Sequence, residues 1–137
     1  MRFLAWHVDY VRATPTERGR SSMLGNPESV YAENALLVFA NFEKADEQHT
    51  TDVVDRAISE ITAITAQLGV KTVVLNPFAH LFAEPCSLET ASGMLDSLHK
   101  GLSDRQFDVK RMAFGMFYEL ELKAKGHRLS RIARSIG

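Results

Sequence analysis

The sequence predicts an α/β fold in which helices pack on a mixed β-sheet. Two amphipathic stretches with helical spacing are separated and flanked by short apolar runs of strand type, and this order is typical of a sheet covered by helices. The 137 residues, of which 45% are hydrophobic and 24% charged, have the size and composition of one ordinary globular domain. We therefore expect a single domain over residues 1–137. The composition excludes a disordered chain, a collagen-like repeat and a disulfide-stapled mini-protein.

The chain opens with a predicted strand over residues 3–10. Four side chains alternate onto one of its faces: Leu4, Trp6, Val8 and Tyr10. Residues 11–34 are polar and are interrupted by glycines and prolines, which predicts a long loop or a frayed hairpin arm. The apolar run over residues 36–42 then predicts a second strand.

The first predicted helix begins at Thr50 or Thr51, either of which can cap it. Apolar residues then recur at spacings of three and four and form one buried stripe: Val54, Ile58, Ile61, Ile64 and Leu68. Gly69, which an apolar residue follows, is typical of a left-handed C-terminal cap. The β-branched and apolar residues 72–75 predict a central strand, which the Asn-Pro pair after it brings to an end.

The second half of the chain predicts a helix, two strands and a last helix. Ser87 can cap the first of these helices, and Gly101 repeats the glycine stop signal at its end. Its apolar stripe consists of Leu88, Ala91, Met94, Leu95 and Leu98. Residues 107–112 and 117–124 predict two strands that are interrupted near Gly115. A final short helix is expected from the pattern of Leu129, Ile132, Ala133 and Ile136.

Charge is distributed unevenly along the chain, although the net charge is −1. Residues 28–60 contain eight acidic and two basic side chains, whereas residues 105–137 contain eight basic and three acidic ones. Basic faces contact phosphates and supply most of the non-specific affinity for nucleic acids. The basic last third therefore fits either an RNA-facing surface or an ordinary solvated face, and composition does not separate the two.

Several classes of chemistry are excluded by what the sequence lacks. The single cysteine, Cys86, rules out a disulfide within the chain and a cysteine-rich zinc site, and we expect it to be a small core or helix-entry residue rather than a nucleophile. The five histidines have no metal-ligand spacing, and phosphate-loop, hydrolase-elbow and zinc-protease motifs are absent. The first residues are apolar over too short a run for us to expect a signal peptide, and the sequence has no run of about 18 apolar residues. We therefore expect a cytoplasmic protein that needs no metal, cofactor or membrane.

Two segments remain as candidate sites. Residues 76–81 follow the most buried predicted strand, and ligands of open α/β sheets bind at such strand ends. His80 in this segment could titrate, form a hydrogen bond or orient a water molecule, or it could be a structural histidine. In the second segment, residues 111–118, Phe117 and Tyr118 offer a stacking surface and a hydroxyl group, or alternatively belong to the core.

Five short motifs occur along the chain: His7-x-Asp9-Tyr10, Glu43-Lys44-x-Asp46, Asn76 to Leu81 with Pro-Phe-Ala-His-Leu, Ala113-Phe114-Gly115, and Lys125-Gly126-His127-x-Leu129. In this order and at this spacing they resemble the archaeal-type threonyl-tRNA synthetase N-terminal editing domain. Each motif is weak alone, but together they cover almost the whole chain. The resemblance implies a fold like that of D-aminoacyl-tRNA deacylases, usually a homodimer, and hydrolysis of L-serine wrongly esterified to threonine tRNA.

The resemblance also implies a particular branch and further partners. The Ser-Gln-x-Thr and Gly-Pro signatures of the bacterial-type D-aminoacyl enzymes are absent, which favours the seryl-editing branch. No class II synthetase motif is present, so we expect a synthetase catalytic module in cis or in trans. Two alternatives stay open: a D-aminoacyl-tRNA deacylase, and a non-catalytic module that binds tRNA or dimerises.

Proofreading of this kind has a physical rationale. Serine is threonine without one methyl group, and a pocket gains only about 1–3 kcal/mol from a methyl group. A site shaped for threonine therefore admits serine, whereas a tight second pocket can admit serine and reject threonine by steric clash. We expect Pro77, Phe78 and Ala79 to form the wall of this second pocket, with backbone groups that bind the seryl amine and hydroxyl.

The resemblance assigns further site residues. The segments that it places against the terminal adenosine of the tRNA, largely through main-chain contacts, are Asn41-Phe42-Glu43 and Ala113-Phe114-Gly115. His80 matches the active-site histidine of the family, and Phe117 matches an aromatic residue of the pocket. The chain departs from the family at two positions: Tyr118 stands where a catalytic-site lysine is found, and Arg131 where the last helix has a glutamate.

These departures bear on the mechanism. Ester hydrolysis needs an activated water and stabilisation of the developing oxyanion. Tyr118 is a poor substitute for a cation, although its hydroxyl can donate a hydrogen bond. Either the activity has decayed, or the side chains position the ester while the 2′-hydroxyl of the terminal adenosine, which the family is thought to use, assists the reaction. We favour the second alternative, with His80 and Tyr118 as positioning groups.

Overall fold

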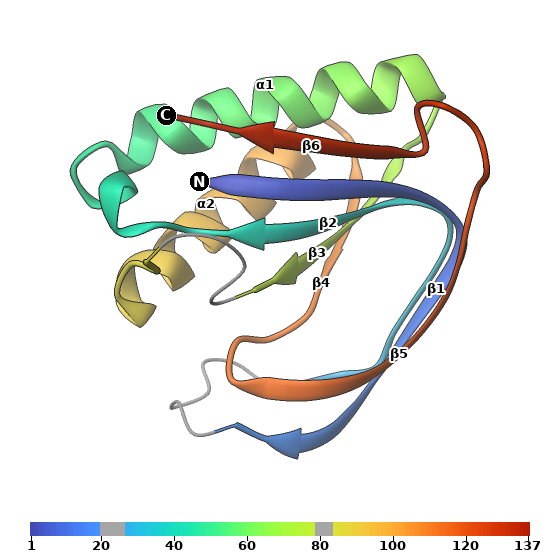
Figure 1. The fold of residues 1–137 in the computed structure, drawn as a ribbon, viewed down its shortest axis with the longest axis horizontal. Helices are drawn as coiled ribbons and strands as arrows, with labels where there is room; N and C mark the ends of the chain where they lie inside the picture. Colours follow the sequence, from blue (N-terminus) through green and yellow to red (C-terminus); the bar gives the residue numbers. More distant parts are fainter. Residues whose placement is uncertain (20–26, 79–83) are drawn as a thin grey trace.

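The computed structural model describes residues 1–19, 27–78 and 84–137. In this part of the chain the elements are β1 (Arg2–Arg18), β2 (Val30–Asn41), the 3-10 helix η1 (Lys44–Gln48), α1 (Thr50–Leu68), β3 (Thr72–Pro77), α2 (Leu88–Asp104), β4 (Asp108–Arg111), β5 (Met116–Ala124) and β6 (Arg131–Ser135). The strands lie in the order β4-β3-β2-β1-β5, and β6 also pairs with β1 (Figure 1). β1 is antiparallel to β2, β5 and β6, whereas β3 is parallel to β2 and β4. The predicted mixed sheet with packed helices is confirmed.

β1 is bent and belongs to two halves of the sheet. Its first part, residues 2–6, pairs with β6, and its later part, from Val8 onward, pairs with β5. The register of the second pairing shifts between Val8 and Tyr10, and such irregularities increase the bend of a strand. Figure 1 shows the result, a sheet that curls round so that β5 lies below the other strands.

Of the two predictions for residues 11–34, a long loop is wrong for the described part of this segment and a hairpin arm is confirmed, because β1 and β2 pair antiparallel there. Residues 11–18 continue β1, and residues 30–34 belong to β2. Pairing with β2 buries Val11 completely, and packing of this kind overrides the local turn signals of glycine and proline. Pro15 is accommodated because the pairing with β5 becomes irregular just after it.

Both faces of the sheet are apolar. The side chains of β2 that point toward the helices are Leu36, Val38 and Ala40, and they form the main core with α1 and α2. Leu37 and Phe39 point the opposite way, to the concave side of the curled sheet. Both helices lie on the same side of the sheet (Figure 1), so the concave side is where a binding site is left open.

α1 carries the predicted apolar stripe into the core, with Val54, Ile58, Ile61 and Ile64 buried. Gly69 has a φ of +69°, and its N–H donates to the Thr65 carbonyl, so the predicted left-handed cap is confirmed. The predicted threonine cap is wrong. His49 precedes the first helical residue and makes no capping bond with its side chain, because η1 leads almost directly into α1.

α2 begins at its predicted cap but ends later than predicted. Ser87 Oγ accepts a hydrogen bond from the backbone N–H of Thr90 at 3.2 Å. The helix does not stop at Gly101 and runs on to Asp104. A Cβ at position 101 would overlap the side chain of Ile58, so this glycine permits close packing of α1 and α2 rather than helix termination.

We expect Ser87→Ala to lower the free energy of unfolding by about 1 kcal/mol, because an N–H in the first turn of α2 loses its acceptor. Urea unfolding followed by circular dichroism measures this change. Ser97→Ala, on the exposed side of the same helix, is the matched control and should change the stability by less than about 0.5 kcal/mol. Equal losses in the two variants would contradict a capping role for Ser87.

The predicted last helix is wrong, because residues 131–135 form β6. Ile132 packs toward the helix-side core and Ile136 is buried in it, while Arg131 and Ala133 point to the other face. Apolar residues at 132, 133 and 136 fit a helical period and a strand period about equally well over so short a segment. Pairing with β1 decides the outcome, including the Ile136 N–H that donates to the Met1 carbonyl at 2.7 Å.

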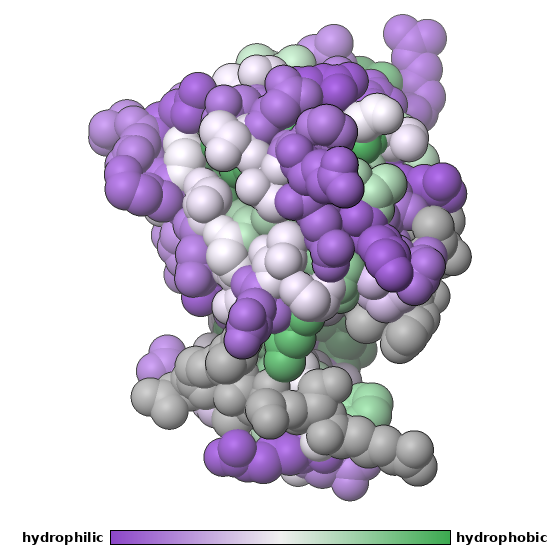
Figure 2. All heavy atoms as spheres, turned by 90° about the vertical axis from the view of Figure 1, so that its left-hand side faces the viewer, coloured by the Kyte–Doolittle hydropathy of each residue, from purple (hydrophilic) through white to green (hydrophobic). Residues whose placement is uncertain are grey.

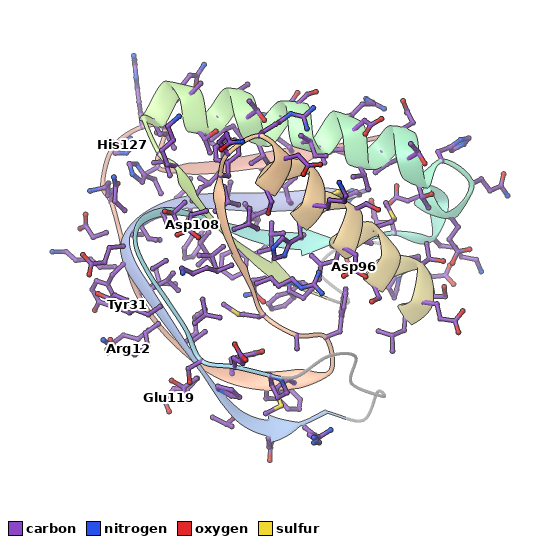
Figure 3. All side chains as sticks on the ribbon, turned by 180° about the vertical axis from the view of Figure 1, so that it is seen from behind. Arg12, Tyr31, Asp96, Asp108, Glu119 and His127 are labelled. Atoms are coloured by element: carbon purple, nitrogen blue, oxygen red, sulfur yellow. The ribbon has the colours of Figure 1, made fainter. Side chains whose placement is uncertain are left out.

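The motif that contains His7 and the motif that contains His127 are joined by hydrogen bonds at the bend of the sheet (His127 is labelled in Figure 3). The Leu129 N–H donates to Nδ1 of His127 at 3.2 Å, so Nε2 of His127 carries the proton and donates to Nδ1 of His7 at 3.0 Å. His7 Nε2 in turn donates to Oδ1 of Asn34 at 2.9 Å. Lys125 forms an ion pair with Asp9 beside these hydrogen bonds, and it holds the pKa of the Asp9 carboxyl below its usual range.

Candidate active site

A cavity of about 560 Å³ opens at the carboxyl end of β3. Seven of the residues predicted for the site line it: Pro77, Phe78, Ala113, Phe114, Gly115, Phe117 and Tyr118. They come from the end of β3 and from the connection between β4 and β5. The strand end and the aromatic segment that the sequence singled out separately therefore form one site.

The β3 side of this cavity is tied to the sheet by backbone pairing. Pro77 lies beside Ala40 of β2, and the N–H of Phe78 donates to the Ala40 carbonyl at 2.7 Å. The Phe78 side chain is 43% exposed and meets Phe39 edge-on, with 6.1 Å between the ring centroids. This stretch of wall is thus held in place by the edge of β2.

The opposite side of the cavity is the turn between β4 and β5. Gly115 has a φ of +72°, a conformation that favours glycine. Its carbonyl accepts the N–H of Gly19 at 2.7 Å, which joins the turn to the end of β1. The interruption that the sequence predicts near Gly115 is confirmed, because β4 ends at Arg111 and β5 begins at Met116.

Tyr118 is anchored inside the cavity by its own hydroxyl. The N–H of Ala113 donates to Tyr118 Oη at 2.8 Å. None of the described residues accepts the hydroxyl hydrogen of Tyr118, which is therefore available to a ligand. Phe117, the next residue back along β5, points the other way and is 58% exposed at the rim.

Three other predicted residues, Asn41, Phe42 and Glu43, lie at the end of the neighbouring strand and do not line the cavity. Phe42 packs into the helix-side core, and Glu43 lies 3.4 Å from the α-amino group of Met1. Asn41 is fully buried, and neither its side-chain oxygen nor its side-chain nitrogen has a partner among the described residues. Buried amides without partners are rare in folded proteins, and each one lowers the stability of the fold.

The remaining predicted residues fall elsewhere. Arg131 lies on β6 and not on a helix, and its guanidinium sits 5.6 Å from the centre of the Trp6 ring, outside the cavity lining. Ala79 and His80 lie outside the described residues. Sequence reasoning missed several lining residues, of which Gly19 is the clearest, because the segment that contains it was interpreted as part of a loop.

Metal-binding and nucleophilic side chains do not form a site in the described part of the chain. Its histidine, cysteine and acidic side chains form no cluster of three or more that could hold a metal ion. Burial raises the pKa of the Cys86 thiol, and the charges of Glu47 and Asp46 add to this shift, so the reactive thiolate is disfavoured. Cys86 directly precedes the cap of α2, as expected for a helix-entry residue.

Neither described helix is long and apolar enough to cross a membrane. The side of the molecule on which α2 and β5 begin is shown in Figure 2. Its surface is largely hydrophilic, with a small apolar patch.

Residues 1–136 match the family model described as the archaea-specific editing domain of threonyl-tRNA synthetase. The chain is 34% identical over 137 residues to the threonine–tRNA ligase of Methanococcus vannielii, and 33% identical over 136 residues to that of Methanoregula boonei. These alignments cover 100% and 99% of the chain but 22% of each relative, so the chain spans about a fifth of their length.

A solved structure, that of a c-Myc DNA Unwinding Element Binding Protein, matches 98% of the chain and 98% of its own length. The TM-score is 0.73 and the sequence identity is 12%, so the likeness concerns the fold alone. The fold class expected from the sequence is confirmed by this match.

Proposed function

The chain belongs to the archaea-specific editing domains of threonyl-tRNA synthetase, and we propose that it hydrolyses the ester of L-serine mischarged on threonine tRNA. The observation that supports this proposal most is that Pro77 and Phe78 line the same cavity as the segment over residues 113–118. One side of the cavity would receive the seryl group and the other the terminal adenosine.

In this proposal, selection against threonine depends on the cavity wall at Pro77 and Phe78, whose backbone is held in place. Pro77 has a restricted backbone, and the N–H of Phe78 is held by the Ala40 carbonyl. An extra methyl group therefore meets fixed atoms instead of a yielding side chain. Because such a group is worth only about 1–3 kcal/mol of discrimination in a binding pocket, a clash against fixed backbone is the more effective way to exclude the larger amino acid.

In the proposed reaction a water molecule attacks the carbonyl carbon of the seryl ester, and the bond from that carbon to the 3′-oxygen of the adenosine then breaks. The water gives up a proton and the 3′-oxygen receives one, and the neighbouring 2′-hydroxyl of the substrate relays this proton. Tyr118 donates its available hydroxyl hydrogen to the developing oxyanion. His80 acts as a second positioning group. No step requires a metal ion.

We expect Tyr118→Phe to slow single-turnover hydrolysis of the seryl ester by about tenfold, because one hydrogen-bond donor to the oxyanion is lost while the substrate hydroxyl still acts. His80→Ala should have a similarly modest effect. Tyr31→Phe, which removes an exposed hydroxyl bonded to Glu33 on the outer side of the sheet, is the matched control and should leave the rate unchanged. A loss of more than about 1000-fold in Tyr118→Phe would make the tyrosine the main catalyst and contradict the proposal.

The alternatives are separated by a deacylation assay on L-seryl and D-aminoacyl esters of the same tRNA. Preference for the L-seryl ester supports the proposal, and preference for D-aminoacyl esters supports a chiral-proofreading enzyme. Retained tRNA binding without any hydrolysis at micromolar protein supports a non-catalytic module. We further propose that the domain acts in the cytoplasm as a homodimer beside a synthetase catalytic module, in cis or in trans, and analytical ultracentrifugation tests the dimer.

A further inference from the structure

Four side chains form a row across the concave face of the sheet: Arg131 on β6, Trp6 on β1, Phe39 on β2, and Phe78 just after β3. Strand register places them on one face, since Trp6 lies opposite Arg131 and Phe39 lies beside Asn76. The Arg131 guanidinium is 5.6 Å from the centre of the Trp6 ring. Trp6 and Phe39 meet edge-on with centroids 5.3 Å apart, and Phe39 and Phe78 do so at 6.1 Å.

Arg131 differs from Arg12, which also lies over an aromatic ring. Arg12 lies 5.0 Å from the centre of the Tyr31 ring on the outer side of the curled sheet (Figure 3), but its guanidinium is paired with Glu121 at 2.9 Å. No acidic side chain among the described residues pairs with Arg131, which is exposed. Its charge is therefore not neutralised by a neighbouring carboxylate.

Aromatic rings on a sheet face, together with an arginine plane, are the chemistry by which proteins hold unpaired RNA. Bases stack on the rings, and the guanidinium both stacks and attracts phosphate. We propose that this row is the platform for the unpaired nucleotides that precede the terminal adenosine of the tRNA. The inference rests on the proposed function, which places that adenosine in the cavity.

Continuity with the cavity favours RNA over a second copy of the chain as the occupant. Phe78 is both the last member of the row and part of the cavity wall. An RNA strand that leaves the cavity past Phe78 would contact Phe39 next, then Trp6, and finally the cation of Arg131. Apolar contact with a second copy would leave that cation without a partner, whereas a phosphate group provides one.

The test uses the fluorescence of Trp6, which is the single tryptophan of the chain. An uncharged RNA minihelix that reproduces the acceptor stem with its unpaired 3′ end is titrated into the protein, and a blunt-ended duplex of the same stem serves as the comparison. Stacking predicts quenching by the minihelix and little change with the blunt duplex. Equal quenching by both RNAs, or none by either, would overturn the platform.

Arg131→Ala should raise the Kd of the minihelix about tenfold. Arg134→Ala is the matched control, because Arg134 lies on the same strand, points to the opposite face and pairs with Glu60 at 3.1 Å. Equal losses in the two variants would show general charge attraction and overturn the proposal. So would an Arg131→Ala variant that shifts the monomer–dimer equilibrium in ultracentrifugation without weakening RNA binding.

A parallel assay of seryl-ester hydrolysis distinguishes failure of the proposed platform from failure of the proposed function. Hydrolysis that occurs without Trp6 quenching overturns the platform and leaves the proposed function standing. Quenching that is specific for the unpaired end, without hydrolysis of any ester, supports the platform and contradicts the proposed function.

Discussion

Seryl-tRNA whose terminal adenosine lacks the 2′-hydroxyl should be hydrolysed at least about 100-fold more slowly than the normal substrate. The described part of the cavity offers one positioned hydroxyl, that of Tyr118, and no charged group that could replace the lysine of the family. The substrate hydroxyl is adjacent to the ester and needs no further ordering, which is the situation in which a proton relay is most effective. Removing it therefore removes the main source of acceleration.

Single-turnover rates with protein in excess measure this effect without interference from product release. The matched control is the same tRNA with the 2′-hydroxyl removed one nucleotide earlier, which should react at the normal rate. In Tyr118→Phe the deoxy substrate should lose a further factor of about ten, because the tyrosine serves the oxyanion whereas the relay serves the water proton and the 3′-oxygen. A normal rate on the terminal deoxy substrate would rule out substrate assistance.

Asn41→Leu should stabilise the domain. The amide of Asn41 is fully buried and has no partner among the described residues, and an unsatisfied buried polar group costs about 1–3 kcal/mol. Leucine has a similar size and no polar atoms. We therefore expect the free energy of unfolding to rise by about 1–3 kcal/mol.

Asn34→Leu is the matched control with the opposite sign. The side-chain oxygen Oδ1 of Asn34 accepts a hydrogen bond from His7, and the residue has a positive φ of 45°, so leucine there should lower the stability. Urea unfolding compares the three proteins. A loss of stability in Asn41→Leu would contradict the account that the unsatisfied amide is a net cost to the fold.

The sequence predicted those elements in which apolar residues recur with one period over many positions. The stripe of α1, its Gly69 cap and the Ser87 cap of α2 are set by side chains close together in the sequence. β6 was not predicted, and residues 11–18 could not be assigned to a loop or to a hairpin arm from sequence, because both segments depend on pairing with a distant part of the chain. Gly101 was misinterpreted for the same reason, since its neighbour Ile58 lies on another helix.

The candidate site was predicted in part. The strand end at Pro77-Phe78 and the segment around Gly115 were found separately from composition and turn chemistry, and the fold brings them to one cavity. That Tyr118 is fixed by the Ala113 N–H depends on the geometry of the turn between them and is not visible in the sequence. The position of Arg131 over Trp6 follows from the register of β6 on β1, which the prediction of a helix excluded.

The central claim, that this cavity is a sieve for serine, is tested most directly by two substrates that differ in one methyl group. The measurement is single-turnover hydrolysis of L-seryl and L-threonyl esters of the same threonine tRNA by the 137-residue chain. We predict that the seryl ester is hydrolysed at least about tenfold faster, in line with the free energy of a methyl group against a fixed wall. Equal rates, or faster hydrolysis of the threonyl ester, would contradict the account.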